Sequence, residues 1–437
     1  MKPVALYLLL AATPGAYAQT VSLSQYQSAH AEGADDTWRA LLQPAVARAL
    51  ARSPERARSQ AAEAASSAEL SGALGQRLPQ LRATGNSNSK AWGANADAVS
   101  TQGHALRLEM VTPLYDGGGR QASIRGQRHL LEAAGETREQ VSLDLAWSVV
   151  SLLVELGKQQ AIIELASDYQ VRMTDLVSRL SEIVRADPGR ASELTQARAR
   201  LLQAQAAVDA ARSGQRDAEL GLASLLGDSG VPSAVLRNPA LLPVPLAEWL
   251  QHIDAHPAVK ASAALSSTAC AQADAAWAQR LPQLSWVVGK PLESDNLGRE
   301  KPWSTHLSMS WAAFDGGQAR AARQASLHRS QMADEDQRLA LQQLEYQLRE
   351  AHQAAQVAVQ RAQLYERLSE ESAQIRQAFF EQWYQLGRRT LLDVLASETD
   401  HFSNRQIAVA SRFEASAAVL RGYWRAGTLL DWLQIGD

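Results

Sequence analysis

The sequence contains one cysteine, Cys270, among its 437 residues. A single thiol excludes a disulfide framework and a cluster of thiolate metal ligands. An excess of one charge is also lacking, because 43 basic and 46 acidic residues leave a net charge of −3. No global electrostatic field would therefore attract nucleic acid or an anionic membrane surface. We expect no nucleic-acid partner.

Motifs for catalysis and for cofactors are absent as well. The nine histidines lack the spacing of two ligands on one helix face. Asp-Gly-Gly occurs at 116–118 and again at 315–317, but no Gly-Lys-Ser or Gly-Lys-Thr follows, which excludes a phosphate-binding loop. No nucleophile with a neighbouring base can be recognised. The sequence predicts no enzyme, no catalytic residue, no cofactor and no metal site.

Long hydrophobic runs are missing too, and we expect no helix that crosses a membrane. The N-terminus has the order of an export signal, with Lys2, an apolar stretch at 4–12 and an Ala-Tyr-Ala cleavage site at 16–18. A buried N-terminal helix or a short membrane anchor is the alternative, but the apolar stretch is too short to span a bilayer. We predict a signal peptide at 1–18 and a mature protein that leaves the cytoplasm.

Two short motifs occur twice in the same order. Gln-Arg-Leu-Pro-Gln-Leu at 76–81 recurs at 279–284, and Tyr-Asp-Gly-Gly at 115–118 recurs as Phe-Asp-Gly-Gly at 314–317, at offsets of 203 and 199 residues. Such nearly constant offsets predict two tandem copies of one structural unit. The expected boundaries are a first repeat at 19–226, a proline-rich linker at 227–247, a second repeat at 248–430 and a C-terminal tail at 431–437.

Each repeat is expected to contain two strands. In the second repeat the apolar residues Trp303, Thr305, Leu307, Met309 and Trp311 alternate with polar ones, which predicts a strand with one apolar and one polar face. The strands are predicted within 80–115 and within 284–311. An Asp-Gly-Gly turn follows each strand pair. Its glycines would supply positive φ, and Asp116 and Asp315 would cap the helices that follow. The predicted strand-to-helix turns are Asp116, Gly117, Gly118, Asp315, Gly316 and Gly317.

A long helical hairpin is expected after each strand pair, at about 120–226 and about 316–426. Apolar residues follow one another at steps of four and three from Tyr169 to Ile183, which is typical of packed helices. No proline interrupts residues 120–186, and a continuous helix over that stretch would be roughly 100 Å long. Breaks are predicted at 187–189 and 387–389. The predicted fold is mainly α with a small β part.

Four strands are too few to close a barrel, since the smallest common barrels have about eight. An open sheet in lipid would leave backbone groups unpaired at a cost of several kcal/mol each. We therefore expect several chains to share one barrel, with their helices continuing below it as a periplasmic tunnel.

These motifs, together with Gly-Arg-Arg-Thr-Leu-Leu-Asp-Val-Leu at 387–395, resemble the TolC family of outer-membrane efflux and type I secretion channels. The resemblance extends over about 38–430. It implies a homotrimer with a shared 12-strand outer-membrane barrel and a helical tunnel. It also implies a Gram-negative outer-membrane location and two kinds of partner, a periplasmic adaptor (membrane fusion) protein and an inner-membrane RND or ABC transporter.

The resemblance further implies a gate at the periplasmic end. Arg389 matches an arginine that links neighbouring helices, and Asp393 matches the first of two aspartates that ring the constriction. Ala396 stands at the second aspartate position, which weakens the expected acidic ring. Ser192 and Glu193 lie at the matching turn of the first repeat, where they could pair with Arg389. Ordinary surface charges on a solvated tip are the alternative.

Two other classes of protein carry long helices. A periplasmic adaptor has one helical hairpin within a β-rich domain, whereas two hairpins alternate with strand pairs here. A coiled-coil scaffold without a channel would require soluble strands. Both are alternatives to an exit duct.

Overall fold

The computed structural model describes residues 23–86, 105–227, 241–292, 300–386 and 388–435. The predicted signal peptide and most of the predicted linker lie outside these ranges. The elements of the first half are α1 (Leu23–Arg52), α2 (Pro54–Gly75), β1 (Gln80–Asn86), β2 (Ala105–Tyr115), α3 (Gly119–Ala186), η2 (Pro188–Arg190) and α4 (Ala191–Leu226). Those of the second half are α5 (Leu246–Leu250), η4 (Ile253–Ala255), α6 (Pro257–Ala278), β3 (Gln283–Pro291), β4 (Ser304–Ser310), α7 (Gln318–Tyr384), α8 (Leu391–Arg425) and α9 (Leu429–Trp432).

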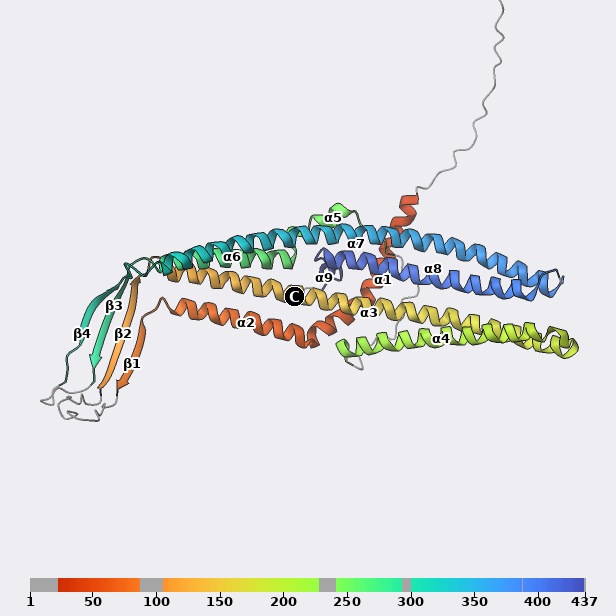
Figure 1. Ribbon diagram of the computed structural model, residues 1–437, viewed down its shortest axis with the longest axis horizontal. Coiled ribbons are helices and arrows are strands. Elements are labelled where there is room, and N and C mark those ends of the chain that lie inside the picture. The colour runs from red at the N-terminus through yellow and green to blue at the C-terminus, as the bar shows by residue number, and fades with distance from the viewer. Residues whose placement is uncertain (1–22, 87–104, 228–240, 293–299, 387, 436–437) are drawn as a thin grey trace, which may run out of the picture.

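The order helix, strand pair, long helix, return helix occurs in both halves, as the internal repeat predicts. Helices α3 and α7 have 68 and 67 residues. At about 1.5 Å per residue each is roughly 100 Å long. In Figure 1 both helices extend from the sheet at one end to the far tip, and the sheet is bent away from the helix axis.

The long helices form a wall one helix thick (Figure 1). Next to the sheet the order across the wall is α2, α3, α6, α7, and toward the tip it becomes α4, α3, α8, α7. The helices α2 and α4 therefore form one edge of the wall and α7 forms the other. Helix α3 lies inside the wall and has neighbours on both sides over its whole length.

The core has two main parts. Near the middle of the wall, α1, α3, α4 and α8 pack around buried residues that include Trp38, Leu42, Val149, Leu222 and Phe413. Leu241, from the predicted linker, is buried in the same cluster. Toward the tip, Tyr169 of α3 stacks on Phe402 of α8 with ring centroids 4.4 Å apart. The two repeats are thus joined through apolar contacts in both regions.

Helix α3 differs from the expectation in one respect. It contains an 18-residue window that is apolar enough, by length and composition, to cross a membrane. Of that window 56% is buried inside this single chain. Such burial is typical of a core helix. The buried apolar residues of α3 from Leu143 to Leu156 pack with α1, α4 and α8.

Candidate functional site

The described strands form one antiparallel sheet in the order β1-β2-β3-β4, and its register separates the side chains by polarity. Leu81 pairs with Met110, Met110 with Val288, and Trp286 with Leu307. Directly paired residues lie on the same face. One face is therefore largely apolar and includes Leu81, Leu108, Met110, Trp286, Val288, Leu307 and Met309. Lys290, which pairs with Leu108, and two threonines lie on the same face.

The opposite face of the sheet is largely polar. Arg82 pairs with Glu109 across β1 and β2, and Ser285 pairs with Ser308 across β3 and β4. All residues of β4 are exposed, including Leu307 and Met309 of the apolar face. The backbone edges of β1 and β4 have no strand partner in the described part of the chain. One chain thus presents an uncovered apolar face and two open edges.

Both Asp-Gly-Gly turns convert a strand into a helix by the same contacts. The carboxylate of Asp116 accepts hydrogen bonds from the backbone N–H groups of Gly118, at 3.1 Å, and Arg120, at 2.8 Å. Asp315 accepts from Gly317, at 3.0 Å, and from Ala319, at 2.8 Å. The bond from Ala319 is the main reason that the pKa of Asp315 lies below its usual value. Each aspartate therefore caps the helix that follows.

The glycines of these turns have the positive φ that the turn requires. Their φ values are 66° and 87° at Gly117 and Gly118, and 67° and 91° at Gly316 and Gly317. Gly117 also lies close to Leu281 of the second repeat, because an added Cβ would be 2.6 Å from its Cδ1 atom. An added Cβ at Gly316 would meet open space. The first turn is therefore packed and the second is not.

The hairpin tip of the first repeat is closed by its own charged residues. Asp187 accepts a hydrogen bond from the N–H of Gly189 at 3.1 Å, and η2 follows. Glu193 accepts from Nη2 of Arg190 at 2.7 Å. Ser192 is exposed on the first turn of α4. Within one chain Glu193 is therefore paired with Arg190, whereas the sequence led us to expect a pairing with Arg389. Arg190 is only three residues from Glu193, so this ion pair forms without any contact between the two hairpins.

The tip of the second repeat is closed by a capping box. Thr390 and Asp393 exchange bonds, because the hydroxyl of Thr390 accepts from the N–H of Asp393 and the carboxylate of Asp393 accepts from the N–H of Thr390, at 3.3 and 3.2 Å. The guanidinium of Arg389 lies 4.2 Å from the ring centroid of Phe379, and its Nε donates to Gln382 at 3.2 Å. The Nη1 atom of Arg389 is 4.0 Å from a carboxylate oxygen of Asp393. Asp393 thus has a structural role besides its charge.

Ala396 is exposed one turn beyond Asp393 on α8. Asp400, one further turn along the helix, is exposed as well. The spacing of three and four residues puts these three positions on one face of α8.

A buried charge cluster above the tip was not expected from the sequence. Glu398 of α8 is 5% exposed and accepts from Arg172 of α3, at 3.3 Å, and from Arg376 of α7, at 3.2 Å. The only local signal is an acidic residue within the apolar stripe of Val394, Leu395 and Phe402. Since both arginines come from distant segments, the sequence gives no means of pairing them. The cluster ties three helices and both repeats together.

His401 lies next to this cluster and is buried. Its Nδ1 is 3.0 Å from the hydroxyl of Ser372 on α7. Burial is the main cause that lowers the pKa of His401, and the positive charges of Arg376 and Arg172 lower it further. The imidazole is therefore neutral at neutral pH.

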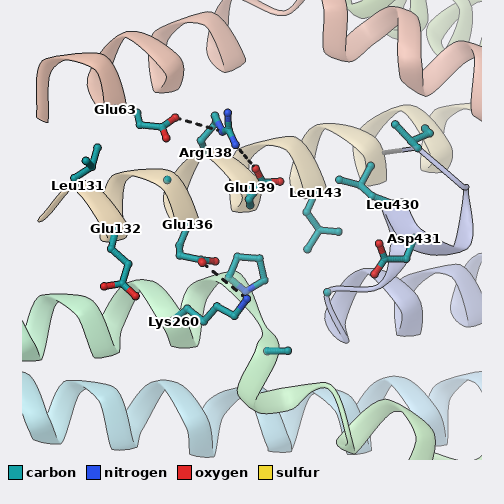
Figure 2. A pocket seen from close by; sticks show the side chains of 15 residues that line it. Glu63, Leu131, Glu132, Glu136, Arg138, Glu139, Leu143, Lys260, Leu430 and Asp431 are labelled. Atoms are coloured by element: carbon teal, nitrogen blue, oxygen red, sulfur yellow. Dashed lines mark hydrogen bonds and ion pairs between the residues drawn. The ribbon is translucent and has the colours of Figure 1, made fainter. Parts of the chain in front are cut away.

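A cavity of about 580 Å³ lies where α2, α3, α6 and the turn after α8 meet. Figure 2 shows Arg138 between Glu63 and Glu139, and Lys260 pointing toward Glu136. Burial raises the pKa of Glu136, although Lys260 opposes the shift. These ion pairs join α2 and α6 to α3. In the ranges that the structure describes, no group of three or more His, Cys, Asp or Glu residues is arranged to hold a metal ion.

Residues 45–228 and 251–423 match the protein family described as Outer membrane efflux protein. The chain belongs to this family. The two matched segments fall on the two repeats, and the resemblance to the TolC family is confirmed. Among curated proteins, CyaE of Bordetella pertussis is 28% identical over 292 residues. That match covers 62% of this chain and 60% of CyaE, so less than two thirds of CyaE is spanned.

Solved structures share the fold at low sequence identity. CusC matches with a TM-score of 0.79 at 18% identity, covering 90% of this chain and 91% of CusC. The outer membrane channel CmeC of Campylobacter jejuni has a TM-score of 0.79 at 15% identity, with coverage of 89% and 86%. The channel MtrE of Neisseria gonorrhoeae has a TM-score of 0.75 at 16% identity, with coverage of 89% for both chains. The predicted fold class, mainly α with a small β part, is confirmed.

Proposed function

We propose that this protein is the outer-membrane exit duct of a tripartite efflux pump or a type I secretion system, and that it acts as a homotrimer. The observation that carries the proposal is the open amphipathic sheet. A sheet with one apolar face and two unpaired edges is unstable alone in lipid. Three copies joined edge to edge, β4 of one chain beside β1 of the next, would supply a closed 12-strand barrel with the polar face toward the lumen.

The edges of the helical wall support the same assembly. Helix α7 carries exposed large apolar residues at intervals that include several heptads: Leu327, Met332, Leu339, Tyr346, Val357, Leu364, Leu368, Ile375 and Tyr384. We call this set the α7 stripe. The opposite edge carries exposed Leu74 on α2 and Leu202 and Leu220 on α4. Packing the α7 stripe of one chain against α2 and α4 of the next would close the wall into a tunnel.

The tips of the hairpins form the gate in this proposal. Three copies of Asp393 around one axis would give a ring of negative charge that favours cations. Arg389, beside Asp393 and Phe379, would hold the second hairpin in the closed position, and Ser192 and Glu193 would face it from the neighbouring hairpin. A periplasmic adaptor would bind near these tips, and an inner-membrane RND or ABC transporter would load the duct. The duct itself would act as a passive conduit.

Membrane fractionation and bilayer recordings test the duct. The mature protein is expected in the outer membrane after a high-salt wash, as an oligomer that dissociates on heating in detergent. Recovery as a soluble monomer that never enters bilayers contradicts the proposal and favours an adaptor or a scaffold.

The gate is tested by single-channel conductance in planar bilayers. Asp393→Asn removes the charge while keeping a side-chain carbonyl that accepts from Thr390, and Arg389→Ala removes the contact with Phe379. Both variants are expected to raise conductance, because each removes one charge of the Arg389–Asp393 pair that would hold the second hairpin in the closed position. Asp209→Asn, on α4 and away from the tip, is the matched control. Unchanged conductance in both tip variants would remove these residues from the gate.

A further inference from the structure

A patch of tryptophan and arginine side chains lies where the sheet of the second repeat meets the helices. Trp311 follows β4 directly and continues the alternation of Leu307 and Met309, so it extends the apolar face of the sheet. Its indole N–H donates to the carbonyl oxygen of Arg280 at 3.1 Å. Trp311 is 57% exposed. The apolar face therefore leads directly to the turn between α6 and β3.

The guanidinium groups of two arginines lie against the ring of a second tryptophan, Trp277. The Cζ atom of Arg280 lies 4.9 Å from the ring centroid of Trp277 on α6, and the Cζ atom of Arg323 on α7 lies 4.1 Å from it. Cation–π contacts at these distances hold the planar groups against the ring and leave their N–H edges available to a ligand. We call Trp277, Arg280, Trp311 and Arg323 the Trp-Arg patch.

The carboxylate of Asp315, which interacts with Arg280 of this patch, is already used by a helix cap. The charge of Arg280 is one of the causes that lower the pKa of Asp315. Its oxygens are occupied by the N–H groups of Gly317 and Ala319. The patch itself thus carries two guanidinium charges beside an apolar, aromatic surface.

The first repeat has no equivalent patch. At the offsets of the repeat, Leu74 stands for Trp277, Thr112 for Trp311 and the buried Ile124 for Arg323. Only Arg77 is retained, in the same Gln-Arg-Leu-Pro-Gln-Leu motif as Arg280. The patch is therefore not required to make the strand-to-helix connection, which both repeats complete with the same Asp-Gly-Gly contacts.

We propose that the Trp-Arg patch binds the phosphate groups of anionic glycerophospholipids in the periplasmic leaflet of the membrane. This inference rests on the proposed function, because it requires the apolar face of the sheet to lie in lipid. Tryptophan prefers the level of the lipid headgroups, and arginine clusters just outside the hydrocarbon attract anionic lipids. The patch lies at the helix end of the sheet, which faces the periplasm in the proposed orientation. Each trimer would carry three such sites.

Lipid selectivity measured by electron spin resonance tests the proposal. The full mature protein is reconstituted into phosphatidylcholine vesicles that contain a small fraction of spin-labelled phosphatidylglycerol or spin-labelled phosphatidylcholine. The ratio of their association constants for the protein surface is expected to favour phosphatidylglycerol and to fall at least about twofold in the double variant Arg280→Gln, Arg323→Gln. High salt is expected to reduce the wild-type ratio, because the attraction is electrostatic.

Two further variants make the result specific. Arg77→Gln changes the same motif in the repeat without the patch and is expected to keep the wild-type ratio. Trp277→Leu introduces the residue found in the first repeat, removes the stacking platform and is expected to lower the ratio while both arginines remain. An unchanged ratio in the double variant, or an equal loss in Arg77→Gln, overturns the inference. Failure of the wild type to enter vesicles overturns the proposed function as well, so the two failures are distinguishable.

Discussion

The long helices of the two repeats have almost the same length but very different surroundings. Helix α3 buries 21 of its 68 residues within the chain, whereas α7 buries 8 of its 67. The difference follows from position, since α3 lies inside the wall and α7 forms its edge. The two copies therefore share a pattern of elements but have diverged in task. Helix α3 of the first repeat lies within the core that both repeats share, whereas α7 of the second repeat presents an apolar edge that needs a partner.

The largest effect is expected from charges placed on that edge. Leu339→Glu combined with Leu364→Glu puts two carboxylates into the α7 stripe and should abolish the heat-sensitive trimer, because two unpaired charges would be buried against the apolar edge of the next chain. Val171→Glu on α3 is the matched control, since Val171 is 68% exposed and does not belong to the stripe. Gel filtration in detergent measures both. A trimer that survives the double substitution would show that α7 is not an intersubunit surface.

The buried cluster that joins the repeats should give the next largest effect. Glu398→Ala leaves Arg172 and Arg376 without their shared carboxylate and is expected to cost roughly 3 kcal/mol per chain, at the lower end for a broken buried pair because both arginines are partly exposed. Thermal unfolding followed by circular dichroism measures the loss. Asp400→Ala, an exposed neighbour on α8, should change stability by less than about 0.5 kcal/mol. Equal effects of the two substitutions would contradict the role of the cluster.

Acid is expected to destabilise the second repeat. Both buried histidines of the described residues, His256 and His401, lie there. Burial is the main cause that lowers the pKa of His256 from 6.5 to about 4. Because the folded pKa lies below the unfolded one, the neutral form is favoured by folding, and stability is lost as the pH falls from about 6.5 toward 4. The loss at pH 5 is on the order of 2 kcal/mol per chain.

His256→Asn removes this titration. The Nδ1 atom of His256 accepts from the N–H of Ala258 and caps α6, and asparagine can cap a helix in the same way. Denaturant unfolding of the variant should therefore depend less on pH between 7 and 5 than that of the wild type. The same slope in both proteins would show that His256 does not account for the acid sensitivity.

The smallest effect is a difference between the two strand-to-helix turns. Gly316→Ala should cost about 1–2 kcal/mol, because alanine disfavours positive φ. Gly117→Ala carries the same penalty and also forces Leu281 to move, so it should cost at least about 1 kcal/mol more. Chemical denaturation of both variants measures the difference. Equal costs would show that the first turn accommodates the methyl group without strain.

Much of the fold could be predicted because its signals are local. The hairpin predicted at about 120–226, with its break at 187–189, agrees with α3 and α4, and α3 is continuous because no proline interrupts it. The alternation at 303–311 depends only on neighbouring residues and recurs in the register of the sheet. The candidate tip was less predictable. Glu193 is paired with Arg190, and Asp393 is occupied in a capping box that its Thr390 partner three residues earlier could have indicated.

The sequence by itself determined the two repeats, the alternating polarity at 303–311 and the extent of the two long hairpins, since periodicity, proline and glycine act over a few residues. Tertiary structure decided which long helix became the core and which the edge, and it brought Arg172 and Arg376 to Glu398 across 226 and 22 residues of chain. Such choices depend on which apolar surfaces meet, and that is settled by the packing of whole helices.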